Sequence, residues 1–86
     1  MPTRTVEQYV KTLYQLERLA SRDVVQMKAL AEAMSVTPGS ATAMVKHLHA
    51  HGLVEYFPRK GTRLTEDGRL LALRMLRRHR LIETFL

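Results

Sequence analysis

Histidines and one glutamate are the residues whose type and spacing best suit metal binding. His79 and Glu83 lie four residues apart in a stretch with helical periodicity, so an imidazole and a carboxylate would share one helix face and could converge on an ion. His47 and His51 share a face in the same way and could hold Zn²⁺, although no third ligand is evident. The alternative for His79 is a histidine beside the apolar face, hydrogen-bonded to Glu83.

The patterns that catalysis requires are missing. Ser21, Ser35 and Ser40 have no neighbouring base and acid at a recognisable spacing. There is neither a glycine-rich phosphate loop nor a carboxylate pair placed for acid–base work. We therefore do not expect an enzyme.

Length and composition predict one small folded domain. The chain has 86 residues, of which 45% are hydrophobic, and it contains no low-complexity tract or internal repeat. Cysteine is absent, which excludes disulfides and thiolate metal sites. No secretory signal and no apolar run of about 20 residues is present, so we expect a soluble cytoplasmic protein without a membrane partner.

The net charge of +6 is concentrated after Pro58. Up to that position the chain has six Lys or Arg residues and five acidic residues. Beyond it there are eight Lys or Arg residues and three acidic residues. The expected partner of such a chain is a polyanion, most often nucleic acid. The alternative is a solvated basic surface that keeps a small domain soluble.

Residues 26–52 have the pattern of a helix-turn-helix. Apolar residues recur at i, i+3, i+4 and i+7 in the first helix; they are Met27, Leu30, Ala31 and Met34. Ser35-Val36 interrupts the pattern, Thr37 is a typical N-cap, and Pro38 suits the first helical position. Gly52 is the expected left-handed stop of the second helix. Its buried stripe is predicted to be Ala41, Met44, Val45 and Leu48.

The outward face of the second helix suits a DNA major groove. It is small and polar at its N-terminal end and basic further along, and a helix N-terminus favours phosphate. We expect Ser40 and Thr42 to hydrogen-bond base edges and Ala43 to contact a thymine methyl. The residues of this helix predicted to contact DNA are Thr37, Pro38, Gly39, Ser40, Thr42, Ala43, Lys46 and His47.

A β-hairpin is predicted after the second helix. Residues 53–57 are β-prone, 58–61 form a basic turn, and 62–64 form the return strand. This wing would place Arg59 and Lys60 on the DNA backbone, where Arg4 is a further candidate contact. The alternative is an ordinary edge hairpin whose charged tip keeps it soluble.

The first helix is predicted from about Val6 to Ala20, after a Thr5–Gln8 capping box. Residues 21–23 break it, and Val24-Val25 form either a short strand or a lead into the next helix.

The last helix opens at Thr65 and is still apolar at Leu86, with no stop signal. We expect either a chain cut from a longer protein or an end packed on another copy. The expected division is residues 1–64 as a winged helix-turn-helix DNA-binding domain and 65–86 as a truncated linker or dimerisation helix. The fold class is mainly α with a small β-hairpin wing.

Four stretches carry a family resemblance: TVEQYVKTLYQLE, MKALAEAMSVTPGSATAMVKHLHAHGLVEY, KGTRLTEDGR and RRHRLIETFL. Together they resemble the iron- and manganese-dependent repressors of bacteria, the family named for the diphtheria toxin repressor. The segment TPGSATAMV is similar to the manganese-responsive branch. Tyr9 and Tyr14, combined with His79-x-x-x-Glu83, make the match more specific than a general winged helix. It covers only the N-terminal winged helix-turn-helix part of a family member.

The resemblance implies binding to a palindromic operator by a homodimer that is switched on by Mn²⁺ or Fe²⁺. His79 matches a family metal ligand, Glu83 matches a ligand of the iron-responsive branch, and Gln8 falls where the family has Met or Asp. Lys11 stands where the manganese branch has Glu, and a protonated lysine cannot be a ligand. Because other ligands would come from the missing segment, this chain is not expected to bind the metal tightly by itself.

We therefore expect a sequence-specific transcriptional repressor that is metal-responsive at full length. Residues 37–51 would enter the major groove, and the wing of residues 57–63 would lie on the backbone. One alternative is a winged-helix interaction or oligomerisation module without metal sensing, whose duplex affinity would not depend on Lys46, Arg59 or Lys60. Another is a membrane-surface helix over the basic, leucine-rich residues 69–80, although their apolar face is better used in the core or a dimer.

Overall fold

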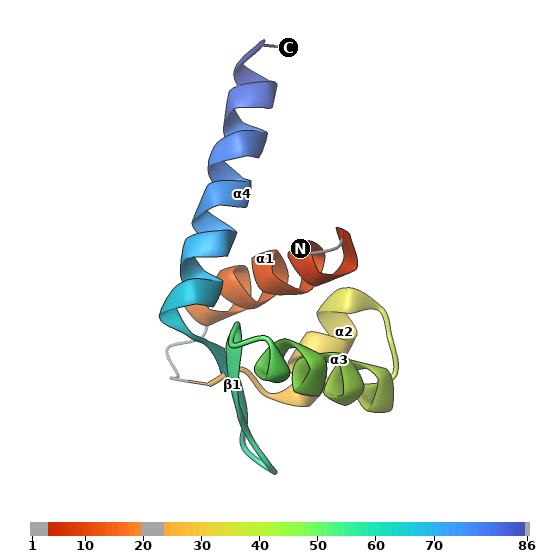
Figure 1. Cartoon of the computed structure of the whole chain (residues 1–86). Coiled ribbons are helices and arrows are strands. Elements are labelled where there is room, and N and C mark those ends of the chain that lie inside the picture. The colour runs from red at the N-terminus through yellow and green to blue at the C-terminus, as the bar shows by residue number, and fades with distance from the viewer. Residues whose placement is uncertain (1–3, 20–23, 86) are drawn as a thin grey trace.

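The computed structural model describes residues 4–19 and 24–85, and for residues 79–85 it describes the backbone alone. Within these residues there are four helices and a two-stranded antiparallel sheet. The hairpin extends from the body on the side away from the end of α4 (Figure 1). The elements are α1 (Arg4–Leu19), α2 (Met27–Met34), α3 (Pro38–Ala50), β1 (Val54–Phe57), β2 (Gly61–Leu64) and α4 (Glu66–Phe85). The predicted architecture, mainly α with a hairpin wing, is confirmed.

Helix α1 begins two residues earlier than predicted, at Arg4. Thr5 is therefore inside the helix, and its prediction as a capping residue is wrong, because a cap needs an extended backbone. Sequence signals place a helix end only to within one or two residues, which accounts for the error. The break predicted at residues 21–23, and Ala20 before it, lie outside the described residues.

The core is formed where α1 crosses the helix-turn-helix. Val10 and Leu13 of α1 are fully buried, as is Leu30 of α2. The α3 stripe is buried as predicted at Ala41, Val45 and Leu48, whereas Met44 is partly buried and packs against the edge of this core. Burying these apolar faces supplies the main driving force for folding.

The hairpin is joined to the helix-turn-helix by a backbone pair. The register of β1 and β2 sets Val54 opposite Leu64 and Phe57 opposite Gly61. Val25, just before α2, pairs with Thr62: the Val25 N–H donates to the Thr62 carbonyl at 2.7 Å, and the Thr62 N–H donates back at 2.9 Å. Of the two alternatives for Val24-Val25, the structure supports the strand-like one. Any side chain at Gly61 would overlap the Val25 carbonyl.

Helix α4 packs through its first half and then projects from the body (Figure 1). Gly68 permits the contact, since a Cβ there would overlap the Leu53 carbonyl. Ala72 and Met75 are buried, whereas Leu70 and Leu73 are 47% and 44% exposed. The buried line therefore runs along Gly68, Ala72 and Met75, whereas the leucines beside it stay at least partly exposed. No helix among the described residues is long and apolar enough to cross a membrane.

Glu17 joins three elements. Its carboxylate accepts a hydrogen bond from the Leu64 N–H at the end of β2 (2.9 Å) and another from the Arg69 guanidinium of α4 (3.4 Å). The Glu17 side chain is 16% exposed, so water reaches it poorly. No local sequence signal predicts this contact, because the partners of Glu17 are 47 and 52 residues away. The boundary predicted between residues 64 and 65 stays a prediction, although β2 and α4 share this carboxylate.

We predict that Glu17→Ala lowers the free energy of unfolding by about 1–3 kcal/mol, because the Leu64 N–H loses its acceptor. Urea unfolding followed by circular dichroism measures the change. The control is Glu55→Ala, which removes a half-exposed ion pair with Arg63 and should cost less than about 1 kcal/mol. Equal effects of the two substitutions would contradict this role of Glu17.

Candidate nucleic-acid interface

The start of α3 is capped as its sequence predicts. Thr37 is extended (φ −72°, ψ 153°), and its hydroxyl oxygen accepts a hydrogen bond from the Ser40 N–H at 3.2 Å. Pro38 occupies the first turn, where its missing N–H costs nothing. Gly52 follows the helix with φ +73°, which confirms the left-handed stop. This N-terminus is exposed, so its other N–H groups remain available to an anion.

The turn between α2 and α3 fixes the angle at which α3 is presented. Ser35 closes α2 in the left-handed conformation (φ 57°, ψ 43°), and its N–H donates to the Glu32 carbonyl. The Val36 N–H donates to the Ala31 carbonyl at 3.0 Å. With these bonds made, the chain reverses over three residues and the helix-turn-helix prediction is confirmed.

The hydroxyl groups on the outward face of α3 differ in what they can offer a ligand. Thr42 Oγ1 donates to the Pro38 carbonyl at 2.9 Å, so it keeps only acceptor capacity and its methyl group. Ser40 Oγ accepts from the Thr37 hydroxyl at 2.9 Å, which leaves the Ser40 proton free to be donated outward. A Cβ added at Gly39 would meet nothing within 4 Å, so this end of α3 is unobstructed by the protein.

The wing tip departs from local backbone preference. Pro58 and Arg59 are the central residues of a turn closed by the Lys60 N–H, which donates to the Phe57 carbonyl at 3.0 Å. Arg59 has φ +69°, a conformation that favours Gly or Asn at the third position of such a turn. A long cation therefore stands where the fold alone would favour glycine.

The cations of the hairpin fall into two groups. Arg63 is held within the protein: it pairs with Glu55 at 3.2 Å and lies over the Phe57 ring at 5.4 Å. Arg59 and Lys60 are exposed, and neither has an ion-pair partner among the described residues. Only the second group is available to a phosphate backbone.

Helix α3 and the wing lie on the side of the molecule opposite the C-terminal end of α4 (Figure 1). The predicted contact residues of α3 are all exposed except Thr42, which is partly buried, and Arg4 is exposed at the start of α1. The structure thus gathers the α3 residues and the two wing cations on one side.

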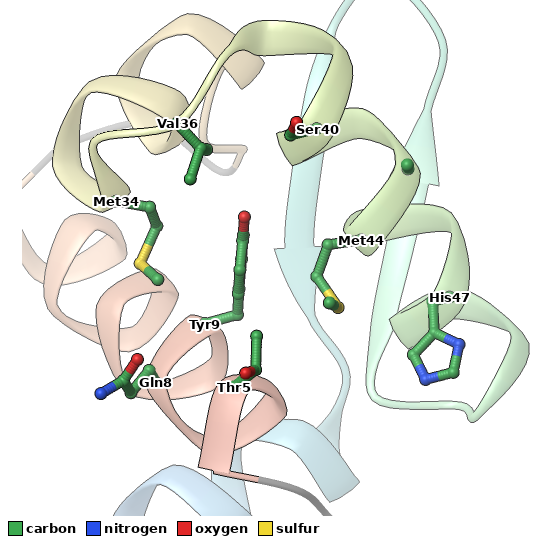
Figure 2. A pocket seen from close by; sticks show the side chains of 9 residues that line it. Thr5, Gln8, Tyr9, Met34, Val36, Ser40, Met44 and His47 are labelled. Carbon is green, nitrogen blue, oxygen red and sulfur yellow. The ribbon is translucent and has the colours of Figure 1, made fainter.

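Sequence reasoning missed a groove between α1 and α3. It has a volume of about 530 Å³, and Tyr9 stands at its centre between Met34 and Met44 (Figure 2). Burial raises the pKa of the Tyr9 phenol above its usual value, so the ring stays neutral. Ser40 and His47 lie on its α3 wall and Gln8 on its α1 wall. Tyr9 lies in the apolar stripe of α1, so the sequence pattern predicts a core residue there. Its hydroxyl group is the one feature that could have indicated a groove.

Of the three predicted metal ligands, Gln8 is the one whose side chain the structure describes. His79 and Glu83 follow each other by one turn on α4, but their side chains lie outside the described residues. Gln8 is exposed and lines the groove with residues of α2 and α3. No group of three or more His, Asp or Glu side chains in the described part of the chain is placed to hold a metal. This ligand set therefore stays a prediction.

A helix-turn-helix packed on an N-terminal helix and followed by a β-hairpin defines the winged-helix class. Within that class the chain belongs to the family of iron-dependent repressors: residues 1–62 match the family's N-terminal DNA binding domain. The predicted family is confirmed.

Relatives agree on this assignment. The HTH-type transcriptional regulator MntR of Lysinibacillus sphaericus is 37% identical over 86 residues, which are the whole of this chain and 60% of that protein. The MntR of Oceanobacillus iheyensis is 36% identical, and 57% of it is covered. The chain thus spans somewhat more than half the length of these relatives.

Solved structures show the same fold. The crystal structure of ScaR with bound Zn²⁺ superposes with a TM-score of 0.78 at 38% identity, and the manganese regulator SloR with 0.72 at 39%. Each match covers 93% of this chain and 36% of the other. A mutant of S. aureus MepR, at 17% identity and a TM-score of 0.74, shares the fold alone.

We predict that Arg59→Gly raises the free energy of unfolding by up to about 1 kcal/mol, because glycine adopts the left-handed conformation without a steric cost. Urea unfolding provides the measurement. Lys60→Gly is the matched control: its backbone has no positive φ, so glycine there should destabilise by about 0.5–1 kcal/mol. A loss of stability in Arg59→Gly would show that the arginine makes a stabilising contact within the fold.

Proposed function

We propose that this chain is the operator-binding domain of a metal-responsive transcriptional repressor and has no catalytic role. One observation carries the proposal: a capped helix with a small, polar outward face lies on the same side as a wing whose tip holds two unpaired cations. Membership of a repressor family supports it. Such a regulator acts on DNA in the bacterial cytoplasm.

In the proposed complex, α3 reads bases. The Ser40 hydroxyl has a proton to donate, which suits an acceptor on a purine edge such as guanine O6 or N7. Thr42 offers an acceptor and a methyl group, and Ala43 offers a methyl group to thymine. Thr37, Pro38 and Gly39 let the helix start approach a phosphate closely.

Backbone contacts fix the position of the helix. Lys46 and His47 extend from the later turns of α3, while Arg59 and Lys60 extend from the wing. Arg4 is a further candidate at the start of α1. Contacts of this kind carry no sequence information and release counterions, so they make binding sensitive to salt. Two copies related by a twofold axis would bind half-sites separated by whole helical turns.

The residues present fit a metal ligand set only in part. An imidazole and a carboxylate one turn apart on α4 are donors that Mn²⁺ and Fe²⁺ accept, so His79 and Glu83 would hold the ion. Gln8 would add an amide oxygen, a weaker donor than a carboxylate. A bound ion would supply a fixed positive charge. Its coordination bonds would join these residues to further ligands.

Duplex binding tests the proposal. We predict that Thr42→Ala changes the base preferred at one position of each half-site among duplexes selected from a random pool.

Lys60→Ala should weaken binding to selected and random duplexes alike and reduce the slope of log affinity against log salt by about 1. Fluorescence anisotropy at several salt concentrations measures both.

Three outcomes of this experiment are informative. Equal effects of Thr42→Ala on selected and random duplexes would remove its role in base recognition. An unchanged salt slope in Lys60→Ala would remove the wing contact. If the unmodified chain binds no duplex, the winged-helix interaction module becomes the better explanation, with the exposed Leu70 and Leu73 as its surface.

Metal response is tested on a protein that joins this chain to the remainder its relatives possess. We predict that Mn²⁺ raises its duplex affinity by about 5–150-fold over a chelator-treated sample, the usual range of coupling between two sites. His79→Gln should abolish the increase but leave the affinity without metal unchanged. An increase that survives His79→Gln would exclude this histidine as a ligand.

A further inference from the structure

His47 lies in the last turn of α3, and His51 is the residue that caps the C-terminal end of this helix. Their ring centroids are 4.4 Å apart, and the ring planes are inclined by 49°. Both residues are exposed. The proposed contacts to DNA explain a histidine at position 47, but neither they nor the helix stop requires a second imidazole beside it.

The hydrogen bond of His51 determines which of its nitrogens is free. Its Nδ1 lies 2.9 Å from the His47 carbonyl oxygen. A carbonyl oxygen only accepts, so Nδ1 carries the proton and donates it, and Nε2 keeps its lone pair. Metal-binding histidines are commonly oriented in this way, with one nitrogen donating to a backbone carbonyl and the other facing the ion.

We propose that His47 and His51 form a binding site for one divalent cation of the zinc, nickel and copper class. Two imidazoles one helical turn apart can reach the same ion, and water would complete its coordination. In the described part of the chain no Asp or Glu joins the two histidines in a group of three. This favours the borderline cations over Mn²⁺ and Mg²⁺, which prefer oxygen. This site is separate from His79 and Glu83 of α4 and does not depend on the proposed DNA contacts.

His49 provides a comparison within the same helix. It lies two residues from each member of the pair, so its side chain leaves α3 on a different face. Its Nδ1 is 3.1 Å from the Val54 carbonyl oxygen of β1, which ties the ring to the sheet. It is therefore a histidine of the same segment that cannot join the pair.

Occupancy of the site would also stabilise the end of α3. An ion held by residues one turn apart bridges the last turn of the helix, which is where helices fray. Since the two ligands converge only when this turn is formed, binding favours the folded chain and raises its melting temperature. This provides a readout that does not involve DNA.

The test uses the 86-residue chain without an affinity tag and the single variants His47→Gln, His51→Gln, His49→Gln and His79→Gln. Isothermal titration with Ni²⁺, and with Zn²⁺ in a second series, measures affinity near pH 7.5, and thermal unfolding measures the shift in melting temperature. We expect one equivalent of metal to bind. His47→Gln and His51→Gln should each weaken binding by about tenfold or more, whereas His49→Gln should bind like the unmodified chain.

A second metal sharpens the test. Mn²⁺ at the same concentration should give no shift in melting temperature. Absence of binding by the unmodified chain, or an equal loss in His49→Gln, would overturn the proposal. A loss in His79→Gln with His47→Gln unaffected would assign the metal to α4 instead.

Discussion

The backbone pairing of Val25 with Thr62 is the contact on which the geometry of this domain depends. It joins the residue that leads into α2 to the strand that carries the wing, and so fixes the hairpin relative to α3. Gly61 is required at this point, because any side chain would overlap the Val25 carbonyl. Glu17 then holds the other end of the same strand against α1 and α4. The hairpin is thus tied at both ends of β2 to the helices of the domain.

Which cations can bind a polyanion depends on which of them already have an acidic partner within the fold, and not on the total charge. Arg63 and Arg69 are used within the fold, one on Glu55 and the other on Glu17. Lys46 of α3 and the wing residues Arg59 and Lys60 are exposed. The count of 14 Lys and Arg residues therefore overstates the cations available to a polyanion, and the count alone could not say which they are.

Local signals predicted the elements well, because each element has a cause that is local in sequence. Thr37, Pro38 and Gly52 set the ends of α3 through bonds and conformations within a few residues. What could not be predicted depends on residues far apart: the burial of Ala72 in place of neighbouring leucines, the carboxylate of Glu17, and the groove around Tyr9. The donor role of Ser40 likewise needed coordinates, since it follows from where the Thr37 proton goes.

Helix α4 is seated by Gly68, Ala72 and Met75 and then continues away from the body. Its 20 residues make a rod about 30 Å long at 1.5 Å per residue. A rod held at one end is a lever, so a tilt of a few degrees at its seat displaces the far end by a few ångströms. Because Glu17 bonds both Arg69 of that seat and the Leu64 N–H at the end of β2, a tilt of α4 would strain the contact that holds the strand of the wing.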